Sequence, residues 1–161
     1  MVPSPNASVP PREPSRGRVL AIDYGRRRIG LALSDSLGLT SQPLATLART
    51  NRRNDVRRLR EIARRYEVGR IVVGHPLHLD GSASEMAAEA ARFAAHIKKQ
   101  LSLPVELVNE RLSSWEAKQV LTASKKASGK LRGEGRIDQI AAAVILRDYL
   151  ERAGKPKREE D

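Results

Sequence analysis

The sequence predicts one α/β domain in which helices pack on a mixed, five-stranded sheet. Three segments with strand patterns come first, and strand and helix patterns then alternate, giving the order β-β-β-α-β-α-β-α-α. Strands joined by short turns favour antiparallel pairing, whereas strands separated by helices favour parallel pairing. The chain has 161 residues, 40% of them hydrophobic and 30% charged, so it is long and apolar enough to bury a core.

Three strands form the predicted antiparallel start. Residues 18–23 contain the continuous apolar run Val-Leu-Ala-Ile, which is typical of a central strand covered on both faces. A Tyr-Gly turn and three arginines follow, and residues 29–34 then alternate as a hairpin partner would. A third strand is expected between about residues 40 and 47, where Pro43 indicates an edge or a bend.

Capping residues locate the next elements. Asn54 or Asp55 could cap a first helix, and residues 71–73 form the following buried strand. Residues 82–85 (Ser-Ala-Ser-Glu) match a capping box before a second helix. The alternation of helix, strand and helix supports parallel pairing in this half of the sheet.

The last part of the chain adds one strand and two helices. Residues 105–108 form the strand, and the capping box at residues 113–116 opens a helix that runs through Leu121. Residues 124–136 are rich in Lys, Gly and Ser and are predicted to be a mobile loop. Apolar spacing from Ile137 onward defines the final helix.

Composition indicates the bounds of the domain and its cellular compartment. Residues 1–16 are rich in Pro and Ser and are predicted to be a disordered arm, residues 17–152 form the domain, and residues 153–161 are a charged tail. No apolar run approaches the roughly 20 residues of a membrane span, and no signal-peptide core is visible. The chain has no Cys, which fits a reducing compartment. We expect a soluble, cytoplasmic protein with no membrane partner.

The charge balance favours a polyanionic partner. Thirty Lys and Arg against 19 Asp and Glu give a net charge of +11, which attracts phosphates. General solubility or a compositional bias toward Arg are the alternatives. Because only 3% of residues are aromatic, a base-stacking reader of single strands is not favoured.

Three acidic residues occupy positions that suit a metal site. Asp23 ends the apolar first strand, Glu110 follows the strand at 105–108, and Asp138 lies in the first turn predicted for the last helix. Strand ends and a helix start meet at one edge of an α/β sheet, where three carboxylates would repel one another unless a cation intervened. Oxygen ligands alone indicate Mg²⁺ or Mn²⁺, and a pair of such ions can promote phosphodiester hydrolysis.

Each acid also has an ordinary interpretation. Asp23 could pair with an arginine of the 26–28 cluster, Glu110 could pair with Arg111 or cap a helix, and Asp138 could interact with the helix dipole. Each acid taken singly favours the ordinary interpretation, whereas their combined placement at strand ends favours the metal site.

Four segments resemble a known family over nearly the whole predicted domain. The chain resembles the YqgF/RuvX family of pre-16S ribosomal RNA nucleases, also described as Holliday junction resolvases. The resemblance lies in LAIDYGRRRIGLALSD (20–35), IVVGHPLHLDGSASE (71–85), NERLSSWEAKQVL (109–121) and RIDQIAAAVILRDYL (136–150), whose order and spacing also match.

The resemblance implies an RNase H-like fold and a metal-dependent nuclease that processes the 5′ end of precursor 16S rRNA in ribosome biogenesis. It places Asp23, Glu110 and Asp138 on the family's catalytic, metal-binding acids. One departure is Asn109, which stands where the family usually has an acid, so that any secondary role of this position in metal binding is weakened.

Several residues near these acids are candidates for substrate binding. Arginines that follow Asp23 are within reach of a phosphate bound there, although a solvated hairpin tip is the alternative. Gly25 and Gly30 flank that turn and suggest close backbone approach. The loop at 74–84 could contact phosphate or ribose or merely cap a helix, and the basic loop before Asp138 could close over substrate or be a connector. The candidates are Arg26, Arg28, His75, His78, Ser82, Arg111, Lys130 and Arg136.

Two rivals share these observations. A resolvase that cleaves four-way DNA junctions would use the same acids on branched DNA and would need a dimer to place two cuts. A non-catalytic RNA-binding assembly factor could keep the fold without the chemistry. The oligomeric expectation is a monomer or a weak homodimer.

Overall fold

The computed structural model describes residues 17–75, 84–109 and 133–154. Eight elements make up these residues. The strands are β1 (Arg18–Asp23), β2 (Arg28–Ser34), β3 (Ser41–Ala48), β4 (Val68–His75) and β5 (Val105–Asn109). The helices are α1 (Arg52–Arg65), α2 (Glu85–Leu101) and α4 (Gly133–Ala153). The predicted arm at 1–16, the helix at 113–121 and most of the tail lie outside the described residues.

The five strands form one mixed sheet in the order β3-β2-β1-β4-β5. β1 pairs antiparallel with β2 and parallel with β4. The edge strands are β3, which pairs antiparallel with β2, and β5, which pairs parallel with β4. The α/β class and the antiparallel three-strand start predicted from the sequence are therefore confirmed. The continuous apolar run of β1 is explained by its central position.

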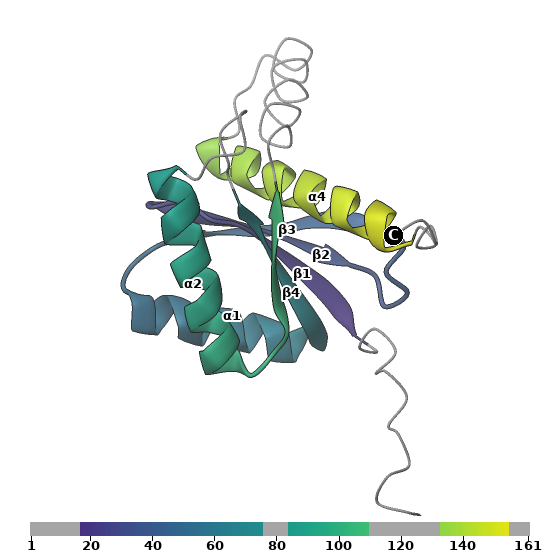
Figure 1. Cartoon of the computed structure of the whole chain (residues 1–161), viewed down its shortest axis with the longest axis horizontal. Helices are drawn as coiled ribbons and strands as arrows, with labels where there is room; N and C mark the ends of the chain where they lie inside the picture. The colour runs from purple at the N-terminus through teal and green to yellow at the C-terminus, as the bar shows by residue number, and fades with distance from the viewer. Residues whose placement is uncertain (1–16, 76–83, 110–132, 155–161) are drawn as a thin grey trace, which may run out of the picture.

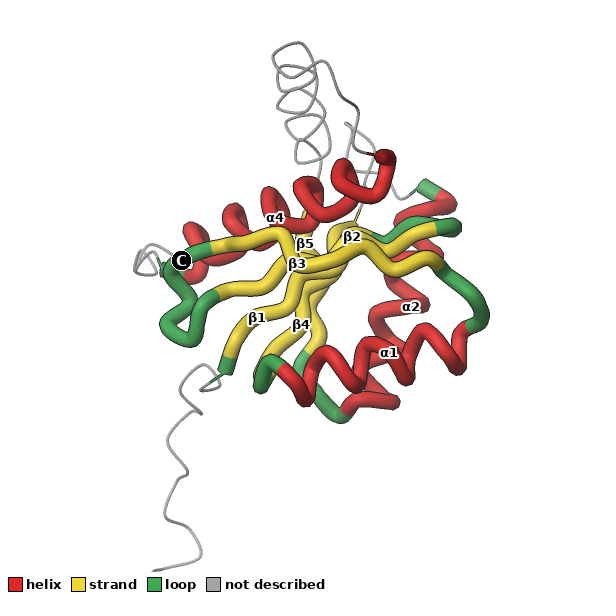
Figure 2. Tube along the Cα trace, turned by 180° about the vertical axis from the view of Figure 1, so that it is seen from behind, coloured by secondary structure: helices red, strands yellow, loops and turns green. Residues whose placement is uncertain are grey.

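Helices cover both faces of the sheet (Figure 1). α1 and α2 lie on one face, and α4 crosses the other face over β1, β2 and β3, as the view from behind also shows (Figure 2). Successive residues of β1 alternate between the two cores: Leu20 and Ile22 pack with α1 and α2, whereas Ala21 packs with α4. In the described ranges, no helix is both long and apolar enough to span a membrane.

The predicted starts of α1, α2 and α4 were wrong. The first helix is capped by Asn51, whose side chain accepts a hydrogen bond from the Asn54 amide, and not by Asn54 or Asp55. The second helix begins after Ser84, which accepts from the Ala87 amide, so the capping box at 82–85 was placed two residues early. A polar cluster before a helix offers several capping residues, and the tertiary contacts of the chain select one.

The final helix also starts earlier than predicted, at Gly133, within the expected loop at 124–136. Two contacts with β3 accompany the added turn: the Thr46 hydroxyl donates to the Gly135 carbonyl, and the Thr46 side chain lies against Gly135. Packing thus overrides the low helix propensity of glycine. As a consequence, Asp138 lies in the second turn of α4 and not in the first.

Candidate active site

The carboxyl ends of three neighbouring parallel strands define one edge of the sheet. Asp23 ends β1, His75 ends β4 and Asn109 ends β5. Ile22 pairs with Val73 and His75 pairs with Asn109, so the three ends are in register. Ligands of α/β proteins commonly bind at this edge. We refer to it below as the active edge.

A glycine in β2 allows α4 to approach the active edge. Gly30 pairs with Asp23 across β1 and β2, and both residues face α4. A Cβ atom on Gly30 would overlap the backbone carbonyl of Asp138 and lie 2.9 Å from the Asp138 Cβ. Only glycine therefore permits this contact, which brings Asp138, from the last helix of the chain, beside Asp23.

The Asp23 and Asp138 carboxylates interact electrostatically. Burial raises the pKa of the Asp23 carboxyl from 3.8 to about 7, and repulsion by the Asp138 carboxylate adds to this shift. Half of the Asp23 carboxyls would therefore be protonated near neutral pH if no cation were present. A divalent cation would relieve both the repulsion and the desolvation cost.

The donor set fits a hard cation. Asp23 and Asp138 offer only oxygen atoms, which Mg²⁺ and Mn²⁺ prefer over the nitrogen and sulfur ligands of zinc. Within the described part of the chain, no group of three His, Cys, Asp or Glu side chains could hold a metal ion. Asp23 and Asp138 therefore supply only part of a metal site. The third predicted ligand, Glu110, lies outside the described residues.

Arg28 holds the Asp138 carboxylate. Its Nε donates to Asp138 Oδ2 at 2.8 Å, and the two side chains are 34% and 22% exposed. Arg28 begins β2, two residues before Gly30, so the same strand supplies both the glycine contact and this ion pair. The pair fixes the orientation of the carboxylate while leaving it reachable from solvent.

Arg26 is tethered to α2 at the same edge. Its Nε lies 3.1 Å from both carboxylate oxygens of Glu89, and Glu85 lies within 3.8 Å. The hydrogen bond from Arg26 lowers the pKa of Glu89. Because the Arg26 side chain is 57% exposed, this pair can be exchanged for another anion at little cost.

A supporting network, which the sequence analysis did not identify, lies behind the turn after Asp23. Arg49 donates to the Tyr24 hydroxyl at 2.8 Å and to the Gly25 carbonyl at 3.2 Å, and its guanidinium lies over the rings of Tyr24 and Phe93. Asp55, only 2% exposed, in turn accepts from Arg49 Nε at 3.3 Å. This network fixes the backbone that carries Asp23.

The structure therefore places the predicted site residues in three groups. Asp23 and Asp138 are brought together, with Arg28 bound to Asp138. His75 lies half-buried at the end of β4, Arg26 is bound to α2, and Arg136 is exposed on α4. Glu110, Arg111, His78, Ser82 and Lys130 lie outside the described residues.

Comparisons with known proteins agree with this fold. The family model described as "RuvX: Holliday junction resolvase" matches residues 17–152. A Koribacter versatilis protein named "Putative pre-16S rRNA nuclease" is 47% identical over 92% of this chain and 97% of its own length. A Syntrophus aciditrophicus protein of the same name is 41% identical over 87% of this chain and 92% of its own length.

Solved structures show the same fold. Thermus thermophilus RuvC in complex with a Holliday junction substrate matches with a TM-score of 0.50 and 16% identity, over 86% of this chain and 96% of its own. The Fowlpox virus resolvase in complex with Holliday junction DNA matches with a TM-score of 0.53 and 15% identity, over 86% and 99%. The RNase H-like class predicted from the sequence is confirmed.

The enzyme class and the family follow from these matches. The relatives are named "Putative pre-16S rRNA nuclease" and the family model is described as a resolvase, so the predicted class, a hydrolase acting on ester bonds, is confirmed. With the family model covering most of the chain and relatives above 40% identity, this protein belongs to the RuvX family.

Proposed function

We propose that this nuclease is metal-dependent and processes the 5′ end of precursor 16S rRNA during ribosome biogenesis. One observation carries the metal dependence: Asp23 and Asp138 meet over Gly30, and the pKa of Asp23 is raised to about 7. A bound cation would stabilise the charged form of both acids, which burial and mutual repulsion otherwise disfavour. The names of the relatives support the RNA substrate.

Asp23, Asp138 and Glu110 would hold two divalent ions, Mg²⁺ or Mn²⁺. When bound, such ions activate water and neutralise charge on the scissile phosphate. Arg28 keeps the Asp138 carboxylate oriented through its 2.8 Å contact. The strand would be cut to leave a 5′-phosphate and a 3′-hydroxyl.

Nearby side chains would position the substrate. Arg26 can exchange Glu89 for a phosphate oxygen, because the pair is exposed. His75 lies at the end of β4, where it would contact phosphate or ribose beside Asp23. The other candidates are Arg28, Arg136, His78, Ser82, Arg111 and Lys130. Within this proposal the protein acts in the cytoplasm as a monomer or weak homodimer.

A second substrate, a four-way DNA junction, is favoured by a specific observation. Two solved structures with this fold are of resolvases in complex with Holliday junctions, and the family model is described as a Holliday junction resolvase. Such an enzyme would use the same acids and would need a dimer to cut two strands symmetrically. We rank it second because the curated relatives are named for rRNA.

Parallel cleavage of precursor rRNA and junction DNA tests both proposals. We expect Mg²⁺- or Mn²⁺-dependent cleavage of the RNA, with mapped ends at the mature 5′ terminus. Asp23→Asn should lower the rate on the order of 10³-fold. Asp35→Asn is the matched control, because Asp35 is an acid in the turn after β2, at the opposite edge of the sheet from Asp23.

Cleavage of junction DNA alone, by a dimer, would favour the resolvase. Activity that survives unchanged in Asp23→Asn would contradict the acid site and favour a contaminant or a non-catalytic RNA-binding protein. RNA binding without cleavage in the presence of either Mg²⁺ or Mn²⁺ would favour a non-catalytic RNA-binding protein.

A further inference from the structure

α1 differs in charge from the other described helices. It contains seven arginines against two acids, whereas α2 has three basic and two acidic residues and α4 has three basic and four acidic residues. One of the two acids of α1, Asp55, is buried and bound to Arg49. The exposed side of α1 is therefore almost purely cationic.

The contacts of these arginines leave their charge available. Arg57 donates to the Asn54 side-chain oxygen at 2.6 Å, Arg58 to the Ala48 carbonyl at 2.7 Å and Arg60 to the Gln100 carbonyl at 3.1 Å. These acceptors are neutral, so the side chains are held in place without losing their net charge. In the described residues, no ion pair neutralises an arginine of α1.

α1 extends away from the active edge. Its first turn follows Arg49, which binds the Gly25 carbonyl just after Asp23. Its last turn leads into β4 at the opposite edge of the sheet. At 1.5 Å per residue, its 14 residues span about 21 Å, the length of several nucleotides in an extended strand.

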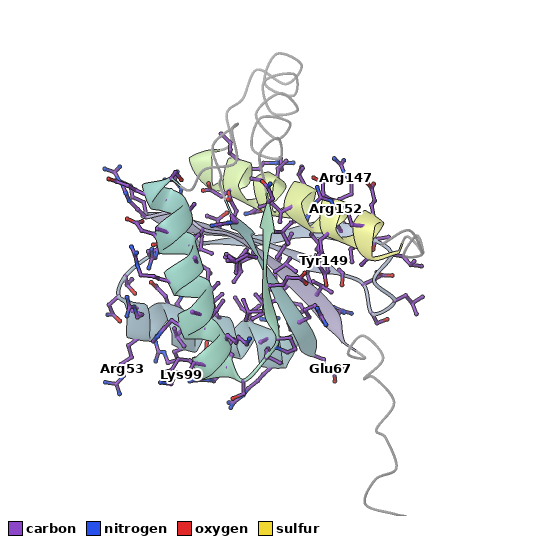
Figure 3. All side chains as sticks on the ribbon, in the orientation of Figure 1. Arg53, Glu67, Lys99, Arg147, Tyr149 and Arg152 are labelled. Atoms are coloured by element: carbon purple, nitrogen blue, oxygen red, sulfur yellow. The ribbon has the colours of Figure 1, made fainter. Side chains whose placement is uncertain are left out.

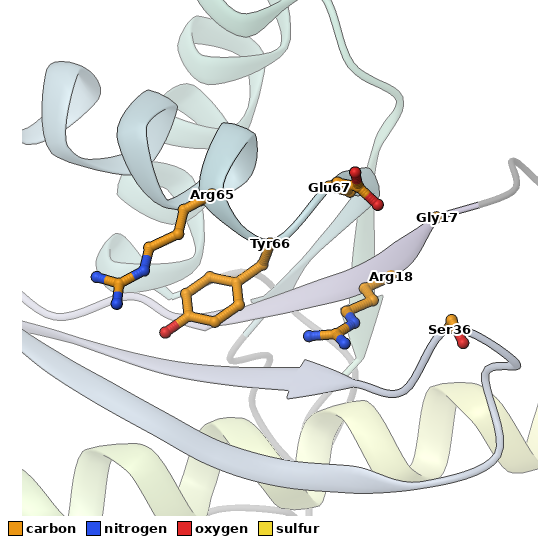
Figure 4. A pocket seen from close by; sticks show the side chains of 6 residues that line it. All are labelled: Gly17, Arg18, Ser36, Arg65, Tyr66 and Glu67. Atoms are coloured by element: carbon orange, nitrogen blue, oxygen red, sulfur yellow. The ribbon is translucent and has the colours of Figure 1, made fainter.

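The far end of α1 is hollowed. Arg65 and Tyr66 line an open pocket of about 360 Å³ together with Arg18, and the Arg65 guanidinium lies 5.6 Å from the centre of the Tyr66 ring (Figure 4). Arg60 and Arg64 line a second hollow of about 410 Å³. Glu67 lines both hollows, yet arginines outnumber it in each.

We propose that α1 is a second binding surface, along which the phosphate backbone of the RNA substrate continues beyond the edge where it is cut. This proposal rests on the proposed nuclease function. The surface consists of the exposed arginines of α1, namely Arg52, Arg53, Arg57, Arg64 and Arg65. Phosphate contacts of this kind position a strand without reading its sequence, and they weaken with salt.

The test compares two double variants of equal charge change. Arg53→Glu/Arg64→Glu alters α1, and Arg147→Glu/Arg152→Glu alters α4 on the opposite face of the sheet (Figure 3). Binding of labelled RNAs of about 6 and about 20 nucleotides is measured in EDTA over a salt series, so that cleavage plays no part. Thermal unfolding checks that both variants are folded.

The α1 variant should bind the long RNA about tenfold more weakly, with a salt slope shallower by about 1.4, and should bind the short RNA within about threefold of the wild type. The α4 variant should bind both RNAs nearly as the wild type does. With metal present, the α1 variant should raise KM for the long RNA and leave kcat unchanged.

Equal weakening by the two variants would overturn the proposal, because net charge alone would explain it. Loss of short-RNA binding in the α1 variant would overturn it too. If the α1 variant does not fold, Arg53→Gln/Arg64→Gln is compared with Arg147→Gln/Arg152→Gln by the same criteria. A wild type that binds as expected but cuts no RNA would contradict the nuclease function and leave the binding result intact.

Discussion

Asp55 and Asp23 are two acids with opposite surroundings. Asp55, at the start of α1, accepts hydrogen bonds from Arg49 Nε, the Thr50 amide and the Thr50 hydroxyl at 3.1–3.4 Å. Asp23, at the end of β1, is buried beside a second carboxylate, Asp138, and its pKa is raised to about 7. The two sites are joined, because Arg49 also binds the turn that follows Asp23.

The difference separates a structural acid from a functional one. The charge of Asp55 is balanced by donors of the protein itself, so its surroundings are complete. In the Asp23–Asp138 pair, Arg28 is bound to Asp138, whereas burial and the neighbouring carboxylate raise the pKa of Asp23, so keeping Asp23 charged costs stability. A buried carboxylate beside a second carboxylate at a ligand-binding edge is the feature expected of a cation site.

The largest expected effect on stability comes from removing the partner of Asp55. Arg49→Met removes the partner of a carboxylate that is 3% exposed, which should lower the free energy of unfolding by about 4 kcal/mol. Urea unfolding measures this change. Arg70→Met is the matched control: it breaks an ion pair with Glu106, whose side chain is 52% exposed, and should cost under about 1 kcal/mol. Similar losses in the two variants would contradict the structural role of Arg49.

The next effect concerns pH in the absence of metal. Because the folded pKa of Asp23 is about 7 and the unfolded value is 3.8, the folded state binds more protons between these values. Asp23 should therefore lower stability progressively, by a few kcal/mol, as pH rises from about 4 to about 7, with no further loss above. Asp23→Asn should be less sensitive to pH and more stable than the wild type at pH 8.

Urea midpoints of both proteins in EDTA at several pH values measure this prediction. The difference between the two curves isolates Asp23 from other titrating groups. Adding Mn²⁺ should restore stability to the wild type above pH 7 and have a smaller effect on Asp23→Asn. Parallel pH curves for the two proteins would contradict a raised pKa of Asp23.

A smaller loss is expected when the close approach of α4 is blocked. A methyl group on Gly30 meets the Asp138 backbone, so Gly30→Ala should cost about 2 kcal/mol and weaken Mn²⁺ binding by separating the acids. Gly135→Ala is the control, since its added methyl meets Thr46 at an ordinary 3.5 Å and favours the helix. Calorimetric titration with Mn²⁺ should distinguish the two; unchanged metal affinity in Gly30→Ala would contradict the role of Gly30.

The sequence predicted the two acids because each breaks a local pattern. Asp23 ends an apolar strand, and Asp138 precedes the small residues Ala141 and Ala142, both of which are buried in α4. Gly30 was expected to allow a close approach, but its partner was not predicted, since Asp138 lies far along the chain. Local pattern is enough where a residue's role depends on its own strand or helix.

Other features depend on distant contacts and were missed for that reason. Asn51, Asn54 and Asp55 are all good capping residues, and the burial of Asp55 against Arg49 leaves Asn51 as the cap. Arg49 has no local signal, because its partners include Tyr24 and Gly25, 25 and 24 residues away.

The smallest expected effect tests whether Arg26 binds substrate phosphate or serves only as the ion-pair partner of Glu89. If substrate phosphate replaces Glu89 on Arg26, then Arg26→Gln should raise KM about threefold, and Glu89→Gln should lower KM about twofold by freeing the arginine. The pair is exposed, so thermal unfolding should hardly change in either variant. Opposite shifts in KM are the decisive sign, because a purely structural pair would change KM in the same direction whichever partner was removed.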